Sequence, residues 1–262
     1  MDFFTHLNPL YTLSGFVVGA LVGMTGVGGG SLMTPVLILL FGVHPATAVG
    51  TDLLYAAATK TAGTAVHGFG RTIEWRIVRR LALGSVPTTA LTILALKYIG
   101  TESAATSALL TRVLSVALVL TALALFFRDK LAAYYASGVG EMNDDRVRTL
   151  TIVMGALLGV LVTLSSVGAG AIGVTALLLL YPKLPVARVV GADIAHAVPM
   201  TLVAGVGHWW IGSVNIDLLL SLLTGSIPGV VITSALVPRA PDGVLRYVLS
   251  IRSEEHTSEL QS

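Results

Sequence analysis

Two aspartates lie in apolar stretches of the sequence, and each is followed by a side chain that could share charge or a proton with it. Asp52 has Lys60 two helical turns further along, and Asp193 has His196 three residues later, on the same face of a helix. A carboxylate inside an apolar helix is costly, so it usually faces a partner or a water-filled cavity. Proton or cation coupling explains the two aspartates as well as a structural hydrogen bond to a nearby loop does. Lys60 could alternatively bind an anionic substrate directly.

A glycine-rich string with adjacent hydroxyl groups precedes each aspartate. The first string is Gly26-Val27-Gly28-Gly29-Gly30-Ser31, and the second is Ser165-Ser166-Val167-Gly168-Ala169-Gly170. Glycine allows the backbone to turn sharply and a ligand to approach it closely. The helix that follows each string would direct unpaired N–H groups and a partial positive charge towards a cavity, which favours an anion. Tight helix packing through small residues is the alternative explanation of the strings.

These patterns define two sets of candidate residues, and other chemistry has little local support. The sequence has no cysteine, no His-Glu-x-x-His metal motif and no Gly-x-Ser-x-Gly nucleophile motif, so we expect no enzyme activity, cofactor or metal. The candidate coupling residues are Asp52, Asp193 and His196. The candidate substrate-binding residues are Gly28, Gly29, Gly30, Ser31, Thr51, Lys60, Ser165, Ser166, Gly168 and Gly170.

Composition places these residues in a membrane protein. Hydrophobic residues make up 54% of the chain and charged residues 11%, whereas soluble domains carry roughly 25% charged residues. The stretch 108–127 contains one charged residue, Arg112. The net charge is +2, and the charged residues stand in short clusters rather than in a basic face, which excludes nucleic acid as a main partner. We predict an all-α integral membrane protein whose partners are the lipid bilayer and a small anion.

The chemistry-bearing residues recur at a constant separation, which indicates two homologous halves. Three features of the first half reappear in the second at the same distance along the chain: Asp52 as Asp193, His67 as His208, and Gly84-Ser85-Val86-Pro87 as Gly225-Ser226-Ile227-Pro228. The glycine-rich strings are slightly closer together, because one residue is gained between string and aspartate. We interpret the two histidines as interfacial or structural residues and Trp209-Trp210 as part of an aromatic belt at the membrane surface.

The apolar segments that must position these residues fall into two matching series. They are predicted at 10–25, 32–43, 47–66, 76–99 and 107–127, and at 150–165, 171–181, 186–207 and 217–237. A span needs roughly 20 apolar residues, so the first two segments of each half are predicted to form a short broken or re-entrant pair. Three full spans should follow in each half. We therefore predict a first transmembrane repeat at 1–128, a linker at 129–149 and a second repeat at 150–251.

The end of the chain departs from this pattern. The polar string RSEEHTSELQS at 252–262 is similar to the translation of a common sequencing adapter, so we expect it to be an artefact. The last span of the second repeat should begin near residue 248, where this string intervenes. We therefore expect the second repeat to be truncated.

Basic residues predict the topology, because cytoplasmic loops hold an excess of lysine and arginine. The loop at 208–217 has no lysine or arginine, although it corresponds to the arginine-rich loop at 67–76. Equivalent loops then face opposite sides, so we predict inverted repeats with the N-terminus outside and the linker 128–149 in the cytoplasm. The basic residues placed inside are Arg71, Arg76, Arg79, Arg80, Arg128, Lys130, Arg146, Arg148, Lys183, Arg188, Arg239 and Arg246.

The string Gly-Val-Gly-Gly-Gly-Ser at 26–31, a helix, and then Gly50-Thr51-Asp52 together resemble the TauE/SafE sulfite exporter family. The resemblance covers residues 10 to about 251. It implies a multi-pass transporter of the bacterial inner membrane, with two repeated halves, that moves sulfite, organosulfonates or related small carboxylated anions. The second half departs from the motif with Gly191-Ala192-Asp193, which leaves the substrate within this group open.

These observations favour a secondary transporter or exporter of small anions, with the substrate between the two glycine-rich strings and a proton or sodium ion as coupling partner. A passive anion channel is the first alternative, and it would need a continuous polar pore rather than two apolar-sealed half-sites. An enzyme embedded in the membrane is the second alternative.

Overall fold

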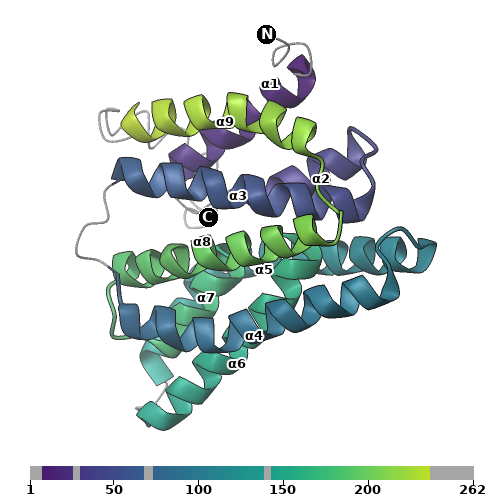
Figure 1. Cartoon of the computed structure of the whole chain (residues 1–262). Helices are drawn as coiled ribbons and strands as arrows, with labels where there is room; N and C mark the ends of the chain where they lie inside the picture. Colours follow the sequence, from purple (N-terminus) through teal and green to yellow (C-terminus); the bar gives the residue numbers. More distant parts are fainter. Residues whose placement is uncertain (1–7, 26–29, 68–72, 139–142, 237–262) are drawn as a thin grey trace, which may run out of the picture.

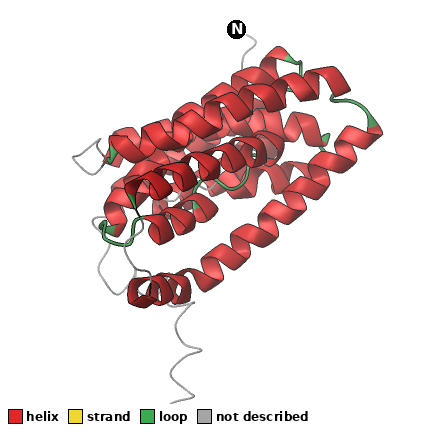
Figure 2. Cartoon of the chain, turned by 90° about the horizontal axis from the view of Figure 1, so that it is seen from below, coloured by secondary structure: helices red, strands yellow, loops and turns green. Residues whose placement is uncertain are grey.

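A computed structural model of the chain describes residues 8–25, 30–67, 73–138 and 143–236 (Figure 1). Every regular element within these ranges is an α-helix (Figure 2), which confirms the predicted all-α class. In chain order the helices are α1 (Pro9–Thr25), α2 (Gly30–Leu39), α3 (Pro45–His67), α4 (Trp75–Ile99), α5 (Ala104–Gly138), α6 (Asp144–Ser165), α7 (Ala171–Leu180), α8 (Val186–Trp210) and α9 (Ile216–Leu236).

Five helices among the described residues are long and apolar enough to cross a membrane. They are Trp75–Ile99, Ala104–Phe127, Asp144–Ser165, Arg188–Trp210 and Ile216–Thr233. Large apolar side chains cover their outer faces, for example Leu91 at 64% exposure and Phe126 at 73%. A water-soluble protein rarely exposes apolar surface of this extent. The prediction of an integral membrane protein is therefore confirmed.

The second half differs from the predicted series at its first helix. The predicted segment 150–165 is too short, because α6 begins at Asp144 and its 22 residues suffice for a span. Asn143 caps this helix by accepting a hydrogen bond from the backbone N–H of Asp145, and two acidic residues stabilise the first turn. The sequence-based boundary was placed too late, because it was drawn from apolar residues and this first turn is polar. The predicted linker 129–149 is likewise largely helical, because α5 continues to Gly138.

Close glycine contacts join the helices into two pairs, α1 with α9 and α4 with α6. A Cβ atom on Gly15 would lie 2.2 Å from the carbonyl oxygen of Leu222, and one on Gly155 would lie 2.2 Å from that of Leu81. Only glycine lets the backbones approach this closely. In Figure 1 the α1–α9 pair lies on one side of the molecule and the α4–α6 pair on the other.

Helices α3 and α8 lie between the two pairs and run antiparallel to each other (Figure 1). Their direction follows from two contacts: Gly50 abuts His208, and Gly205 abuts Leu54. A buried apolar cluster fills their interface, with Val49, Leu53, Ala197, Met200 and Ala204 among its members. The short helices complete the centre, with α2 packed on α3 and α7 packed on α5 and α8. This arrangement brings both aspartates inside.

Candidate functional site

The two central helices bring both predicted aspartates and Lys60 into the buried middle of the bundle. Asp52 on α3 has an exposure of 0%, and Asp193 on α8 has an exposure of 1%. Lys60, also on α3, is buried, and its charge interacts with both carboxylates, more strongly with Asp193 than with Asp52. A buried lysine stays charged only where opposite charge is close, and here the two halves of the chain each supply a carboxylate.

Asp52 is held by the short helix of its own half. Its Oδ2 atom accepts hydrogen bonds from the backbone N–H of Thr34, at 3.1 Å, and from the Thr34 hydroxyl, at 2.5 Å. The other carboxylate oxygen, Oδ1, faces the hydroxyl of Ser166, although neither atom makes a hydrogen bond of normal geometry. Asp52 therefore ties α2 to α3 and meets the glycine-rich string of the other half.

Asp193 is held less firmly. Its Oδ1 atom is buried without a hydrogen bond and lies where a Cβ atom of residue 173 would be: a Cβ built on Gly173 would come within 2.1 Å of it. The backbone of Gly170, at the start of α7, is its nearest donor. The carboxylate thus sits at the first turn of α7, where a helix has N–H groups without acceptors.

His196 connects α8 to α4. Its Nε2 atom lies 2.7 Å from the hydroxyl oxygen of Ser85, whereas its Nδ1 atom is buried without a partner. The ring is 1% exposed, and it shares the interior with Lys60, whose charge acts on it. We name the group formed by Asp52, Lys60, Ser166, Asp193 and His196 the central site.

The hydroxyl groups of Thr51 and Ser165 are occupied in local structure, whereas the side chain of Ser31 lies outside the described part of the chain. Thr51 Oγ1 accepts the backbone N–H of Asn215 at 3.1 Å, which holds the loop before α9. Ser165 Oγ donates to the carbonyl of Leu161 at 2.7 Å and accepts the N–H of Val167 at 3.2 Å. Among the predicted serine and threonine groups described here, Ser166 alone points a free hydroxyl at the central site.

Backbone conformation explains two of the glycines in the second glycine-rich string. Gly168 and Gly170 have φ angles of 119° and 116°, which disfavour any residue with a side chain. In the first string, Gly28 and Gly29 lie outside the described residues. Gly30 and Ser31 form the first turn of α2.

Sequence reasoning did not identify Thr34 and Ser85 as site residues. Ser85 belongs to the repeated Gly-Ser-x-Pro string, which we used only to align the two halves. The recurrence of its serine could have marked Ser85 as a candidate. His208 proves structural, as one interpretation of the sequence had it: its Nε2 atom lies 2.9 Å from the carbonyl oxygen of Thr163 in the protein interior. The side chain of His67 lies outside the described part of the chain, so its interfacial or structural role stays a prediction.

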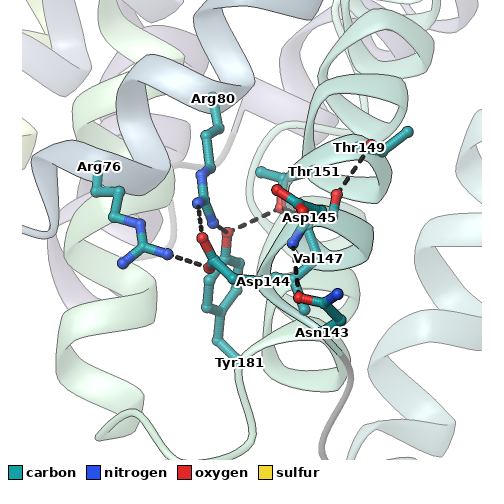
Figure 3. Close-up of polar contacts among 9 residues, drawn as sticks. All are labelled: Arg76, Arg80, Asn143, Asp144, Asp145, Val147, Thr149, Thr151 and Tyr181. Carbon is teal, nitrogen blue, oxygen red and sulfur yellow. Dashed lines mark hydrogen bonds and ion pairs between the residues drawn. The ribbon is translucent and has the colours of Figure 1, made fainter.

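A second polar group, which we name the ion cluster, lies at the arginine-rich end of the bundle (Figure 3). Arg76 and Arg80 both pair with Asp144, the second through Nη2 and Oδ2 at 2.9 Å. Arg80 also donates to the hydroxyl of Tyr181 at 3.3 Å, and this hydroxyl lies 2.9 Å from that of Thr151. The cluster therefore joins the first turns of α4 and α6 to the end of α7.

An ion pair and an aromatic contact lie outside these two groups. Arg188, at the start of α8, pairs with Glu74 before α4 at 2.6 Å. Tyr11 on α1 and Phe41 after α2 meet edge to face, with ring centroids 4.8 Å apart. Among the described residues, no three histidine, aspartate or glutamate side chains are grouped closely enough to hold a metal ion.

Comparison with known proteins gives a family match over nearly the whole chain. Residues 11–252 match the family described as Sulfite exporter TauE/SafE. The chain is 38% identical over 239 residues to the probable membrane transporter protein YjnA of Bacillus subtilis, which covers 91% of this chain and 93% of that protein. It is also 37% identical over 70 residues to the probable membrane transporter protein YunE of the same organism, covering 27% of this chain and 26% of that one.

No solved structure matches the chain. The family match and the curated relatives indicate membrane transport, and the five apolar spans agree with a location in the membrane. The resemblance seen in the glycine-rich string and Gly50-Thr51-Asp52 is therefore confirmed: the chain belongs to the sulfite exporter TauE/SafE family of membrane transport proteins.

Proposed function

We propose that this protein is a secondary transporter of small anions such as sulfite, organosulfonates or related carboxylates across the cell membrane, and that the central site binds them. The observation that carries the proposal is the buried Lys60, on whose charge the carboxylates of Asp52 and Asp193, one from each half of the chain, both act. An anion in a membrane interior needs a buried cation, and Lys60 offers one. The free hydroxyl of Ser166 and the first turn of α7 supply hydrogen-bond donors beside it.

We further propose that the two halves are inverted repeats. Helices α3 and α8, which correspond in the repeat, run antiparallel, as inversion requires. Equivalent contacts also recur, because Gly15 meets Leu222 as Gly155 meets Leu81. The two glycines correspond to each other in the repeat, and so do the two leucines. The exchange of partners between halves supports a two-fold relationship in which each α4-type helix packs on the first helix of the other half.

The two-fold relationship between the halves also extends to two pairs of polar residues, one on α8 and α4 and one on α3 and α9. His196 bonds Ser85 between α8 and α4. Tyr55 on α3 lies near Ser226 on α9, although its hydroxyl donates a hydrogen bond to the carbonyl oxygen of Gly15, at 3.4 Å, and Ser226 Oγ makes no hydrogen bond. In the register set by the two aspartates, Tyr55 corresponds to His196 and Ser226 corresponds to Ser85. The two halves therefore contribute equivalent positions with different chemistry, one imidazole and one phenol.

This arrangement suits alternating access. The glycine contacts make α1–α9 and α4–α6 two close-packed units, and α3 with α8 lies between them. Rocking of one unit against the other would open the central site to one side at a time. The anion would pair with Lys60, and a coupling proton or sodium ion would offset the charge of the carboxylates.

The proposed topology places the N-terminus outside and the ion cluster inside. The first repeat comprises residues 1–128 and the second 150–251, and the helical ends of α5 and α6 enter the cytoplasm between them. Arg76, Arg79 and Arg146 stand at this end, in agreement with the enrichment of basic residues on the cytoplasmic side.

The decisive experiment is counterflow in proteoliposomes with sulfite, thiosulfate, methanesulfonate and acetate. We expect saturable exchange with at least one of these anions and loss of exchange in Lys60→Gln. Lys97→Gln is the matched control, because Lys97 lies over the Trp210 ring at 3.5 Å, away from the central site. Full exchange in Lys60→Gln would refute the site. Flux that does not saturate would indicate the channel alternative.

A further inference from the structure

The two buried carboxylates of the central site have unequal surroundings, although the repeat makes their positions equivalent. Asp52 Oδ2 accepts two hydrogen bonds from Thr34, at 3.1 and 2.5 Å. Asp193 accepts no side-chain hydrogen bond among the described contacts, and its donor is the backbone of Gly170. The Oδ1 atoms of both carboxylates are buried without a partner, so the difference lies in the two bonds from Thr34. A carboxylate that accepts two hydrogen bonds from one threonine favours its charged form more than a carboxylate with a single backbone donor does.

The charged and titratable groups around Asp193 come from two helices. On α3 they are Lys60, which attracts it, and Asp52 further away; on α8 it is His196, one turn along, with an unpartnered Nδ1 atom. Helix α7 presents the glycines at its first turn. Helices α4 and α6 carry their described charged residues at their ends, remote from the middle of the bundle.

This setting favours a proton over a sodium ion. A sodium ion at Asp193 would stand beside the positive charge of Lys60 and would be repelled by it. A proton instead neutralises the carboxylate and leaves the charge of Lys60 available to an incoming anion. Asp193 Oδ1 lies against Gly173, where a Cβ atom would come within 2.1 Å of it.

We propose that the two carboxylates have different roles: Asp193 carries the coupling proton, and Asp52 is a positioning residue that holds α2 against α3. This inference rests on the proposed transport function. Before binding, the site holds the charges of Lys60, Asp52 and Asp193. A monovalent anion then pairs with Lys60, a proton from solution adds to Asp193, and the net charge of the site is unchanged. One proton therefore moves with each monovalent anion, and the cycle is electroneutral.

The test uses the full chain in proteoliposomes at mildly acidic pH, where sulfite is present as the monovalent hydrogensulfite ion, with a pH-sensitive dye inside the vesicles. In Asp193→Asn we expect sulfite counterflow to persist while uptake driven by a pH gradient is lost. A pH difference of about one unit would drive about tenfold accumulation in the wild type and none in this variant. Asp217→Asn, at an exposed carboxylate in the first turn of α9, is the control and should behave as the wild type.

Asp52→Asn and Thr34→Val test the positioning role. Both should lower the melting temperature in detergent and reduce counterflow and gradient-driven uptake in parallel, and the uptake that remains should keep its dependence on the pH gradient. Retained pH-driven uptake in Asp193→Asn, or loss of pH coupling in Thr34→Val with counterflow intact, would overturn the assignment of roles. Uptake driven by sodium in place of the pH gradient would also overturn it.

Failure of the underlying function has a separate signature. If the wild-type chain shows no saturable sulfite counterflow, the proposal that the site carries sulfite fails and the proton assignment for sulfite fails with it. If the wild type exchanges sulfite and Asp193→Asn loses exchange while remaining folded by its melting profile, transport stands and only the division of roles is wrong.

Discussion

Asp193 Oδ1 occupies the space beside Gly173, so that a Cβ atom at that position would lie 2.1 Å from the oxygen. The contact joins the carboxylate on α8 to the first turn of α7. Glycine is therefore required at position 173 because the carboxylate fills the space of a side chain, and not because of the backbone conformation. Helix α7 is regular at this residue, so an alanine would be tolerated by the helix itself.

We therefore expect Gly173→Ala to displace the Asp193 carboxylate. Overpacking of this kind costs about 1–3 kcal/mol, and uptake driven by a pH gradient should fall. Gradient-driven uptake and thermal melting of the purified protein measure the two effects. Ile172→Val, on the same turn, is the control. Normal gradient-driven uptake in Gly173→Ala would show that the position of this carboxylate does not matter.

Ser85→Ala should loosen the contact between α4 and α8. The substitution removes the partner of His196 Nε2, which leaves both ring nitrogens buried without hydrogen bonds. An unsatisfied buried group costs about 1–3 kcal/mol, so the melting temperature should fall. Ser115→Ala, which removes an exposed hydroxyl on α5, should leave it unchanged. Equal melting of the two variants would contradict the structural importance of the Ser85–His196 bond.

Asp144→Asn should weaken the ion cluster. Arg80 is the sensitive partner, because its side chain is 9% exposed, whereas that of Arg76 is 57% exposed. An exposed pair contributes about 0–1 kcal/mol, and loss of the charge facing a buried arginine costs more. Asp145→Asn is a matched control, since both aspartates lie in the first turn of α6. We expect the melting temperature to fall in Asp144→Asn and not in Asp145→Asn. An equal fall in both variants would show that the loss of negative charge at the start of the helix, and not the ion cluster, causes the effect.

The topology can be tested without background labelling, because the chain has no cysteine. Under the proposed arrangement, Glu102→Cys lies outside and Arg146→Cys lies inside, and both residues are exposed. A membrane-impermeant maleimide should label the first in intact cells and the second only after permeabilisation. The reverse pattern would invert the topology, and labelling of both from outside would disprove the proposed orientation of α5.

Much of this fold can be predicted from the sequence, because runs of apolar residues mark the spans and recurring residue types mark the repeat. The polar pairs Asp52 with Lys60 and Asp193 with His196 were identifiable because charges stand out in apolar helices. The first turn of α6 was not identified, because acidic and basic residues there interrupt the apolar count. Helix capping, rather than hydrophobicity, sets that boundary.

The unequal surroundings of the two aspartates could not be predicted from sequence. They depend on how α2 and α7 pack against α3 and α8, which the residue types alone do not determine. Thr34 thus reaches Asp52, whereas Gly173 faces Asp193. Contacts between helices such as Ser85 with His196 are likewise fixed only once the helices pack.

The contact between Tyr11 and Phe41 has a consequence for how the two ends of the bundle respond to salt and temperature. In the register of the glycine-rich strings these two residues correspond to Thr151 and Tyr181, so one end of the bundle has two aromatic rings where the other has hydroxyl groups tied to arginine. Salt screens the exposed charges at the ion cluster and leaves the ring contact untouched, whereas cooling weakens apolar contacts. We therefore expect high salt to loosen the end of the bundle that holds the ion cluster, and cooling to loosen the end that holds the two rings.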